Sequence, residues 1–94
     1  MNKFESVIIV TPTMNDKQQK EIENKYTKLI NENGKVESFE NLGKKKLAYE
    51  IRKYKEGFYM TFNFESEASF ISELERQYRI DDNVIKFIVV RRED

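Results

Sequence analysis

The sequence predicts an α+β domain in which two helices cover one face of a four-stranded antiparallel sheet. Six segments have apolar residues that repeat with the period of a strand or a helix, in the order βαββαβ. Each β-α-β crossover is right-handed, so both helices fall on the same face. The strands then lie in the order 4-1-3-2, which is the arrangement of a ferredoxin-like two-layer sandwich.

The composition limits the classes of function that the chain can have. The chain has 94 residues, enough for one core, so we expect a single domain over residues 1–94. Seventeen basic and seventeen acidic residues cancel, so recognition of nucleic acid has to depend on local clusters of charge. Because the chain has no Cys and no His, disulfides, common zinc sites and His-dependent catalysis are excluded. No apolar run reaches the roughly 20 residues that span a bilayer, and we expect a soluble, cytoplasmic protein without a membrane segment.

The first strand covers residues 4–10, which are rich in β-branched side chains and stop at a Thr-Pro pair. The first helix follows, with Asn15 or Asp16 as its N-cap and Gln18 completing a capping box. Its apolar stripe has helical spacing and ends before Gly34. The stripe consists of Ile22, Tyr26, Leu29 and Ile30.

The next two segments predict a hairpin. Residues 35–51 are polar with widely spaced apolar positions, as expected of an edge strand, and three consecutive lysines there discourage aggregation. The charged residues 52–57 are the expected hairpin tip. Residues 58–64 alternate large apolar with more polar side chains at a period of two, which predicts the third strand.

The last two elements complete the order. Ser66 is expected to cap a second helix over residues 67–79, which Asp81, Asp82 and Asn83 then end. The apolar face of this helix consists of Phe70, Ile71, Leu74 and Tyr78. Residues 84–90 form the final strand.

One face of this sheet is left without helices. By parity, the open face receives Lys86, Ile88 and Val90 from the last strand, and Val7 and Ile9 from the first. Aliphatic side chains on a wet surface favour a partner protein as cover. The alternative is that a returning loop hides part of them.

Two local clusters of cations stand out against the neutral total. The first lies within residues 44–55, where two tyrosines are interleaved with the cations. Such a cluster binds RNA phosphates and stacks on bases, or only protects a sheet edge; the sequence leaves both alternatives open. Its members are Lys44, Lys45, Lys46, Arg52, Lys53 and Lys55, with Tyr49 and Tyr54. The second group, Lys3, Lys86, Arg91 and Arg92, is expected to come together because the first and last strands are neighbours.

The sequence contains no recognisable arrangement of catalytic residues. No carboxylate has an apolar setting and a partner at a useful spacing. The loop after the first strand, residues 11–16, lacks the Gly and Arg residues that would bind phosphate in an acylphosphatase-like enzyme. We therefore expect no enzymatic activity, no catalytic residue, no metal site and no cofactor.

Several motifs carry a resemblance to a known family. The most specific are Leu-Gly at residues 42–43, Leu-Ala-Tyr at residues 47–49 and the helix exit at residues 79–84. Further matches are Phe4, Glu5, Pro12, Gly34, Ile51, Gly57, Lys86, Val89 and Val90. Over nearly its whole length the chain resembles bacterial small ribosomal subunit protein six, the bS6 family. Glu50 departs from the proline that often follows Ala-Tyr in that family.

The resemblance implies a structural, ribosome-associated component of the small ribosomal subunit, a ribonucleoprotein of the translation machinery. It implies binding to the central domain of 16S ribosomal RNA as a heterodimer with small-subunit protein eighteen. We expect the isolated chain to be a monomer. The RNA contacts carried over by position are Lys3, Phe4, Lys86, Arg91 and Arg92. The partner-protein or secondary RNA contacts are Lys44, Lys45, Lys46, Tyr49, Ile51 and Arg52.

The sequence is compatible with two alternative functions. An RNA-recognition-motif type of single-strand binder has the same βαββαβ order and stacks bases on aromatics of the third strand. Gly57 and Phe58 match that signature, but Met60 and Asn63 stand where aromatics are expected. The other alternative is a homo-oligomeric ferredoxin-like module that binds small ligands between subunits.

Overall fold

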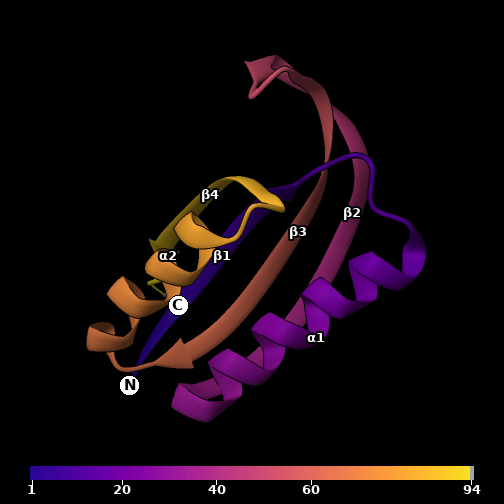
Figure 1. Cartoon of the computed structure of the whole chain (residues 1–94). Helices are drawn as coiled ribbons and strands as arrows, with labels where there is room; N and C mark the ends of the chain where they lie inside the picture. The colour runs from indigo at the N-terminus through magenta and orange to yellow at the C-terminus, as the bar shows by residue number, and fades with distance from the viewer. Residues whose placement is uncertain (94) are drawn as a thin grey trace.

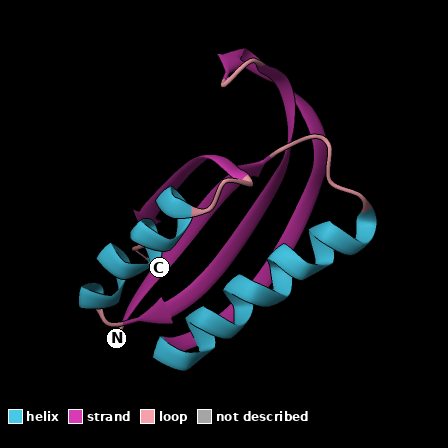
Figure 2. Ribbon diagram, viewed as in Figure 1, coloured by secondary structure: helices cyan, strands magenta, loops and turns pink. Residues whose placement is uncertain are grey.

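The computed structural model describes residues 1–93 and has the predicted architecture. All neighbouring strands are antiparallel and the sheet order is β2-β3-β1-β4. Both helices lie on the same side of the sheet, as Figures 1 and 2 show. The strands are β1 (Asn2–Val10), β2 (Gly34–Ile51), β3 (Tyr54–Ser66) and β4 (Val84–Arg91). The helices are α1 (Asp16–Asn33), the 3₁₀ helix η1 (Ala68–Phe70) and α2 (Ile71–Ile80).

The core lies between the helices and the covered face of the sheet. Met60, Phe62 and Phe64 alternate along β3 and are fully buried, because a strand places every second side chain on the same face. Tyr26 of α1 and Tyr78 of α2 meet above them, with ring centroids 4.7 Å apart. The stripes that predicted the two helices are thus the surfaces that pack on the sheet.

The buried polar groups of this core find partners. The Tyr78 hydroxyl lies 2.9 Å from Ser6 Oγ of β1, and burial raises the pKa of Tyr78. Tyr26 donates its hydroxyl proton to Asp81 Oδ2 at 2.6 Å, and Lys25 Nζ lies 3.0 Å from the same oxygen. The Asn83 backbone N–H donates to Asp81 Oδ1 at 2.9 Å. Asp81 therefore joins α1 to the turn after α2.

Hydrogen bonds determine the direction in which the pKa of the Asp81 carboxyl is shifted. Burial opposes ionisation of Asp81, but the donors from Tyr26, Asn83 and Lys25 outweigh burial, so the pKa of Asp81 lies below its usual value. Burial and the neighbouring Asp81 raise the pKa of Tyr26. The ionised carboxylate and the neutral phenol are therefore the stable pair in the folded chain.

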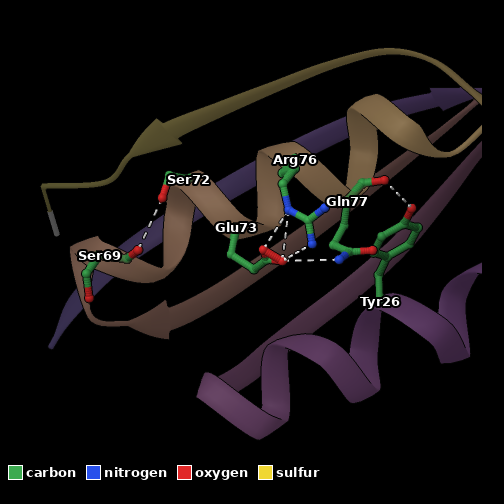
Figure 3. A network of polar contacts seen from close by, with 6 residues as sticks. All are labelled: Tyr26, Ser69, Ser72, Glu73, Arg76 and Gln77. Carbon is green, nitrogen blue, oxygen red and sulfur yellow. Dashed lines mark hydrogen bonds and ion pairs between the residues drawn. The ribbon is translucent and has the colours of Figure 1, made fainter.

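A second polar network lies on the exposed side of α2 (Figure 3). Arg76 and Gln77 donate to the Glu73 carboxylate, and these hydrogen bonds lower the pKa of Glu73 to about 2. The Tyr26 hydroxyl also lies 3.4 Å from the Gln77 carbonyl oxygen, so the network touches α1 (Figure 3). Since Glu73 and Arg76 are exposed to solvent, this pair contributes little to stability.

The two helix starts differ from each other in how well the sequence predicted them. Asn15 is the N-cap of α1 and forms the predicted capping box with Gln18. Ser66 does not cap α2, and that prediction was wrong. Ser66 is still paired on both sides of β3, to Asn2 and Gly34, so its backbone stays extended and the chain first passes through η1.

The hairpin between β2 and β3 turns earlier than predicted. The turn is Arg52-Lys53 alone, and β3 begins at Tyr54 rather than at residue 58. Both turn residues have positive φ, 50° and 69°, as a two-residue type I′ hairpin turn requires. Asn and Gly favour this conformation, and neither stands at residues 52–53, so turn propensity does not identify these two residues within the predicted tip.

Beyond the body of the sheet, this hairpin continues as a two-stranded arm. β1 accompanies β3 only as far as the pair Val10–Phe58, and residues 45–57 pair among themselves. We call residues 45–57 the hairpin arm. It projects past both helices and curves (Figures 1 and 2).

Candidate interaction surfaces

The open face of the sheet carries the side chains that parity predicted, with one exception. Ile88 is 55% exposed and Val90 is 42% exposed, whereas Val7 is half-buried. Ile9 is buried, so the prediction that it adds to the exposed aliphatic surface was wrong. The predicted alternative, in which a returning segment covers part of the face, holds at Ile9.

The hairpin arm is the segment that covers Ile9. Leu47, Tyr49 and Ile51 of the arm line a small cavity together with Ile9. Gly57 makes the approach possible, because a Cβ at this position would lie 2.5 Å from Ile9 Cγ2 and 2.9 Å from the Val10 carbonyl oxygen. The close contact between the arm and β1 therefore depends on glycine at residue 57.

An apolar groove remains beside the covered point. It has a volume of 240 Å³ and is lined by Val7, Ile9, Tyr59, Lys86, Phe87 and Ile88. The hairpin arm bounds it, since Tyr49 of the arm lies with its ring centroid 5.6 Å from Lys86 Nζ. The groove and the inner side of the arm thus form one continuous surface.

Three predicted RNA contacts lie together at the opposite end of the sheet. We call Lys3, Arg91 and Arg92 the terminal cluster. Arg91 is the last residue of β4 and pairs with Phe4, so its side chain lies on the same side of the sheet as that of Phe4. The Arg92 backbone N–H donates to the Lys3 carbonyl oxygen at 2.9 Å. The Arg91 guanidinium donates to Asn2 Oδ1 at 2.6 Å. These cations line a polar surface depression of 480 Å³ together with Met1, Asn2, Glu65 and Glu93.

Lys86 does not join the terminal cluster, and that prediction was wrong. In the antiparallel register Lys86 pairs with Ile9, whereas Arg91 pairs with Phe4. Ile9 lies six residues from Lys3, which corresponds to about 20 Å along β1. Adjacency of two strands brings residues together only where the register aligns them, and the register places Lys86 beside the arm.

Phe4 is not a surface residue. Its ring is buried, lies on the helix-covered side of β1 and stacks on Phe64 with centroids 5.7 Å apart. A side chain in the core cannot contact RNA while the domain is folded. Phe4 is therefore a core residue, and the prediction that its side chain contacts RNA was wrong.

The second predicted set lies on the edge strand and the arm. Lys44, Lys45 and Lys46 are exposed on β2, and Lys44 and Lys45 lie over the rings of Phe58 and Tyr59 at 5.3 and 5.7 Å. Tyr49 is 67% exposed and Ile51 is half-buried. Arg52 lies in the turn. We call Lys44, Lys45, Lys46 and Arg52 the edge cluster.

Residues 1–93 contain no group of three or more acidic side chains arranged to hold a metal ion. None of the helices in this range is long and apolar enough to cross a membrane. The surfaces that the structure does provide are cationic, apolar and located on an open sheet, which suits them to polyanions and to protein partners.

The fold and these surfaces define the class of the protein as a small ferredoxin-like α+β domain with one uncovered sheet face. The family model described as Ribosomal protein S6 matches residues 3–91, which is nearly the whole chain. The chain therefore belongs to the ribosomal protein S6 family, and it is a small-subunit ribosomal protein of the ribosome's translation machinery.

Individual relatives agree with this assignment. Small ribosomal subunit protein bS6 of Caldanaerobacter subterraneus subsp. tengcongensis is 37% identical over 95 residues and is matched over the full length of both chains. The bS6 protein of Azobacteroides pseudotrichonymphae is 41% identical, with 98% of this chain and 83% of the relative covered. The crystal structure of 30S ribosomal protein S6 from Thermotoga maritima is similar with a TM-score of 0.91 at 31% identity, covering 97% of this chain and 87% of that one.

The sequence offered no sign of one participant in these surfaces, Glu37. This residue of β2 forms ion pairs with Lys3 of β1 and with Arg92, the residue that follows β4. It lies where the β2–β3 register shifts, between Val36 and Ser38. The strand order does not suggest this meeting, because β3 lies between β2 and β1.

Proposed function

We propose that this chain binds the central domain of 16S ribosomal RNA jointly with small-subunit protein eighteen. The observation that supports this most strongly is that the terminal cluster and the apolar groove lie at opposite ends of the sheet. A neutral protein with this division can hold RNA phosphates at one end and a protein at the other.

The RNA side of the proposal rests on the terminal cluster. Lys3, Arg91 and Arg92 lie around one depression, and each long cationic side chain can meet phosphate oxygens. Three cations neutralise few phosphates, so the chain alone binds RNA weakly and its affinity falls with salt. A partner that adds contacts on the same RNA raises the affinity of the pair.

The partner side rests on the groove and the hairpin arm. Ile88 and Val90 are exposed beside the groove, and Tyr49 adds an exposed ring at its border. Because the arm curves over the open face, the strand edge and the face are parts of one surface. We assign protein eighteen to this surface, with Ile51 and the edge cluster at its border.

A reconstitution experiment tests the proposal. The chain is mixed with purified protein eighteen and central-domain RNA, and binding is measured at about 0.1 M salt. The double variant Lys3→Gln/Arg91→Gln loses phosphate contacts, so its affinity falls roughly tenfold. The matched control Lys17→Gln/Lys28→Gln removes two exposed cations from α1 and leaves the affinity unchanged. Equal losses in both double variants, or no loss in either, contradict the proposal.

The partner surface has its own test. Lys86→Glu places a negative charge at the groove beside Tyr49 and weakens assembly with protein eighteen, while the exposed position leaves the fold intact. An unfolded Lys86→Glu chain contradicts the assignment of Lys86 to the open face. A tagged chain expressed in its native cell is further expected to copurify with small-subunit particles of the cytoplasm.

The alternative of a base-stacking single-strand binder has little support in the geometry. β1 and β3, both of which the structure describes in full, present one aromatic ring, Tyr59, on the open face, and Lys45 lies over that ring. Stacking of two or three bases needs more rings than this. We further propose that the chain is a monomer when isolated and acts without catalysis or a cofactor, and sedimentation at micromolar concentration tests the first point.

A further inference from the structure

Glu37 stands out at the surface assigned to RNA, because its carboxylate forms ion pairs with two of the cations of the terminal cluster. Its carboxylate takes one cation on each oxygen: Lys3 Nζ lies 3.7 Å from Oε2, and the Arg92 guanidinium donates to Oε1. The three side chains come from β2, β1 and the residue that follows β4. One carboxylate thus occupies two of the three cations of the terminal cluster.

We propose that Glu37 is an internal competitor for RNA phosphate, holding Lys3 and Arg92 in the unbound protein and lowering the RNA affinity of the terminal cluster. This inference rests on the proposed function of that cluster. RNA has to exchange its phosphates for the Glu37 carboxylate, or bind with the carboxylate close by. Either event opposes binding.

The burial of the three groups makes the competition effective. The side chains of Lys3, Glu37 and Arg92 are 37%, 30% and 23% exposed, so solvent and salt screen their ion pairs less than they screen fully exposed pairs. The pairs are nevertheless open on one side, toward the depression, where a phosphate can approach. The cluster is therefore partly shielded and still accessible.

The backbone shows that Glu37 is not required to position the two cations. Lys3 lies within β1 and pairs with Glu65 of β3. The Arg92 backbone N–H is bonded to the Lys3 carbonyl oxygen. Both stems are thus fixed by main-chain hydrogen bonds, and removal of the Glu37 charge breaks its two ion pairs without releasing the stems of Lys3 and Arg92.

The test compares two glutamates of β2. Glu37→Gln keeps the shape of the side chain and removes its charge. Glu40→Gln removes the same charge from the same strand, and Glu40 forms no ion pair within residues 1–93. Glu40 pairs with Thr61, four residues along β3 from Glu65, which places it about 14 Å from the cluster, beyond the Debye length at 0.1 M salt.

Binding of each variant is measured on two ligands at about 0.1 M salt: a 20-base-pair RNA duplex with the chain alone, and central-domain RNA with protein eighteen present. Glu37→Gln is expected to bind the duplex roughly threefold to tenfold more tightly than the wild type, and Glu40→Gln to match the wild type. An unchanged or weaker affinity of Glu37→Gln for the duplex overturns the inference. Equal tightening by Glu40→Gln also overturns it.

The two ligands separate this inference from the proposed function. If Glu37→Gln binds the duplex more tightly while neither it nor the wild type binds central-domain RNA with protein eighteen, the proposed function fails and the role of Glu37 stands. If the wild type binds central-domain RNA and Glu37→Gln gains nothing on either ligand, the proposed function stands and Glu37 is only a surface ion-pair partner.

Discussion

The two faces of the sheet use the same strands for different purposes. Along β3 the even-numbered Met60, Phe62 and Phe64 are fully buried under the helices, while their odd-numbered neighbours face the open side and stay partly exposed. On β4 the half-buried Phe87 packs on Tyr78, and Ile88 next to it is 55% exposed. A single residue step therefore separates a position that holds the domain together from one that is available to a partner.

The largest expected effect tests that division. Phe62→Ala removes a fully buried ring between the sheet and the helices and is expected to lower the free energy of unfolding by about 3–5 kcal/mol. Ile88→Ala, on the open face, is expected to cost less than about 1 kcal/mol, because the side chain already meets solvent. Urea unfolding measures both. Similar losses in the two variants would mean that the faces do not differ in this way.

Gly57→Ala tests the place where the open face is covered by the chain itself. The added methyl group would meet Ile9 Cγ2 and the Val10 carbonyl oxygen, so we expect a loss of about 1–3 kcal/mol in the free energy of unfolding. Adding Ile9→Ala should relieve part of the clash, so the losses in the free energy of unfolding from the two changes should not add. Strict additivity in the double-mutant cycle would show that the arm does not rest on Ile9.

Asp81→Asn tests the polar contacts on the helix side of the sheet, where Asp81 joins α1 to the turn after α2. The change weakens hydrogen bonds from Tyr26, Lys25 and Asn83 to a buried carboxylate and is expected to cost about 1–2 kcal/mol at pH 7.

The pH dependence of that loss has a defined sign. The pKa of Asp81 is lower in the folded chain than its unfolded value of about 3.9, so the stabilisation is complete above that value and is lost as the pH falls through the folded pKa. The difference between wild type and Asp81→Asn should be constant near neutral pH and shrink below about pH 4. A difference that grows on acidification would contradict this assignment.

The smallest expected effect is a gain at the tip of the arm. Arg52→Asn/Lys53→Gly supplies residues that adopt positive φ with little strain and is expected to raise the free energy of unfolding by about 0.5–1 kcal/mol. Thermal unfolding measures the gain, with Arg52→Gln/Lys53→Gln as the control that removes charge alone. Equal stabilisation by the control would assign the effect to charge and not to the backbone.

The sequence predicted the elements that depend on local periodicity. The stripe around Ile22 and Tyr26, the alternation at residues 58–64 and the capping box of Asn15 each act over a few residues, and the structure confirms all three. The strand order followed because right-handed crossovers leave one arrangement for this sequence of elements.

The failures concern contacts between residues distant in the chain. The register that separates Lys86 from Lys3, the curvature that brings the arm over Ile9 and the meeting of Glu37 with Arg92 all depend on the assembled sheet. Ser66 failed as a cap for the same reason, since its pairing to Asn2 and Gly34 overrides a local preference. Phe4 was placed on the surface by resemblance, although the parity of β1 puts it in the core.

In the proposed function, macromolecules dock on the open face and the hairpin arm and leave the helices free. The direct measurement is the change in backbone amide chemical shifts when isotope-labelled chain binds unlabelled protein eighteen. We predict that the largest changes fall at Val7, Ile88 and Val90 and along the hairpin arm, with α1 and α2 unaffected. Changes concentrated on the two helices, with the open face unperturbed, would contradict the account.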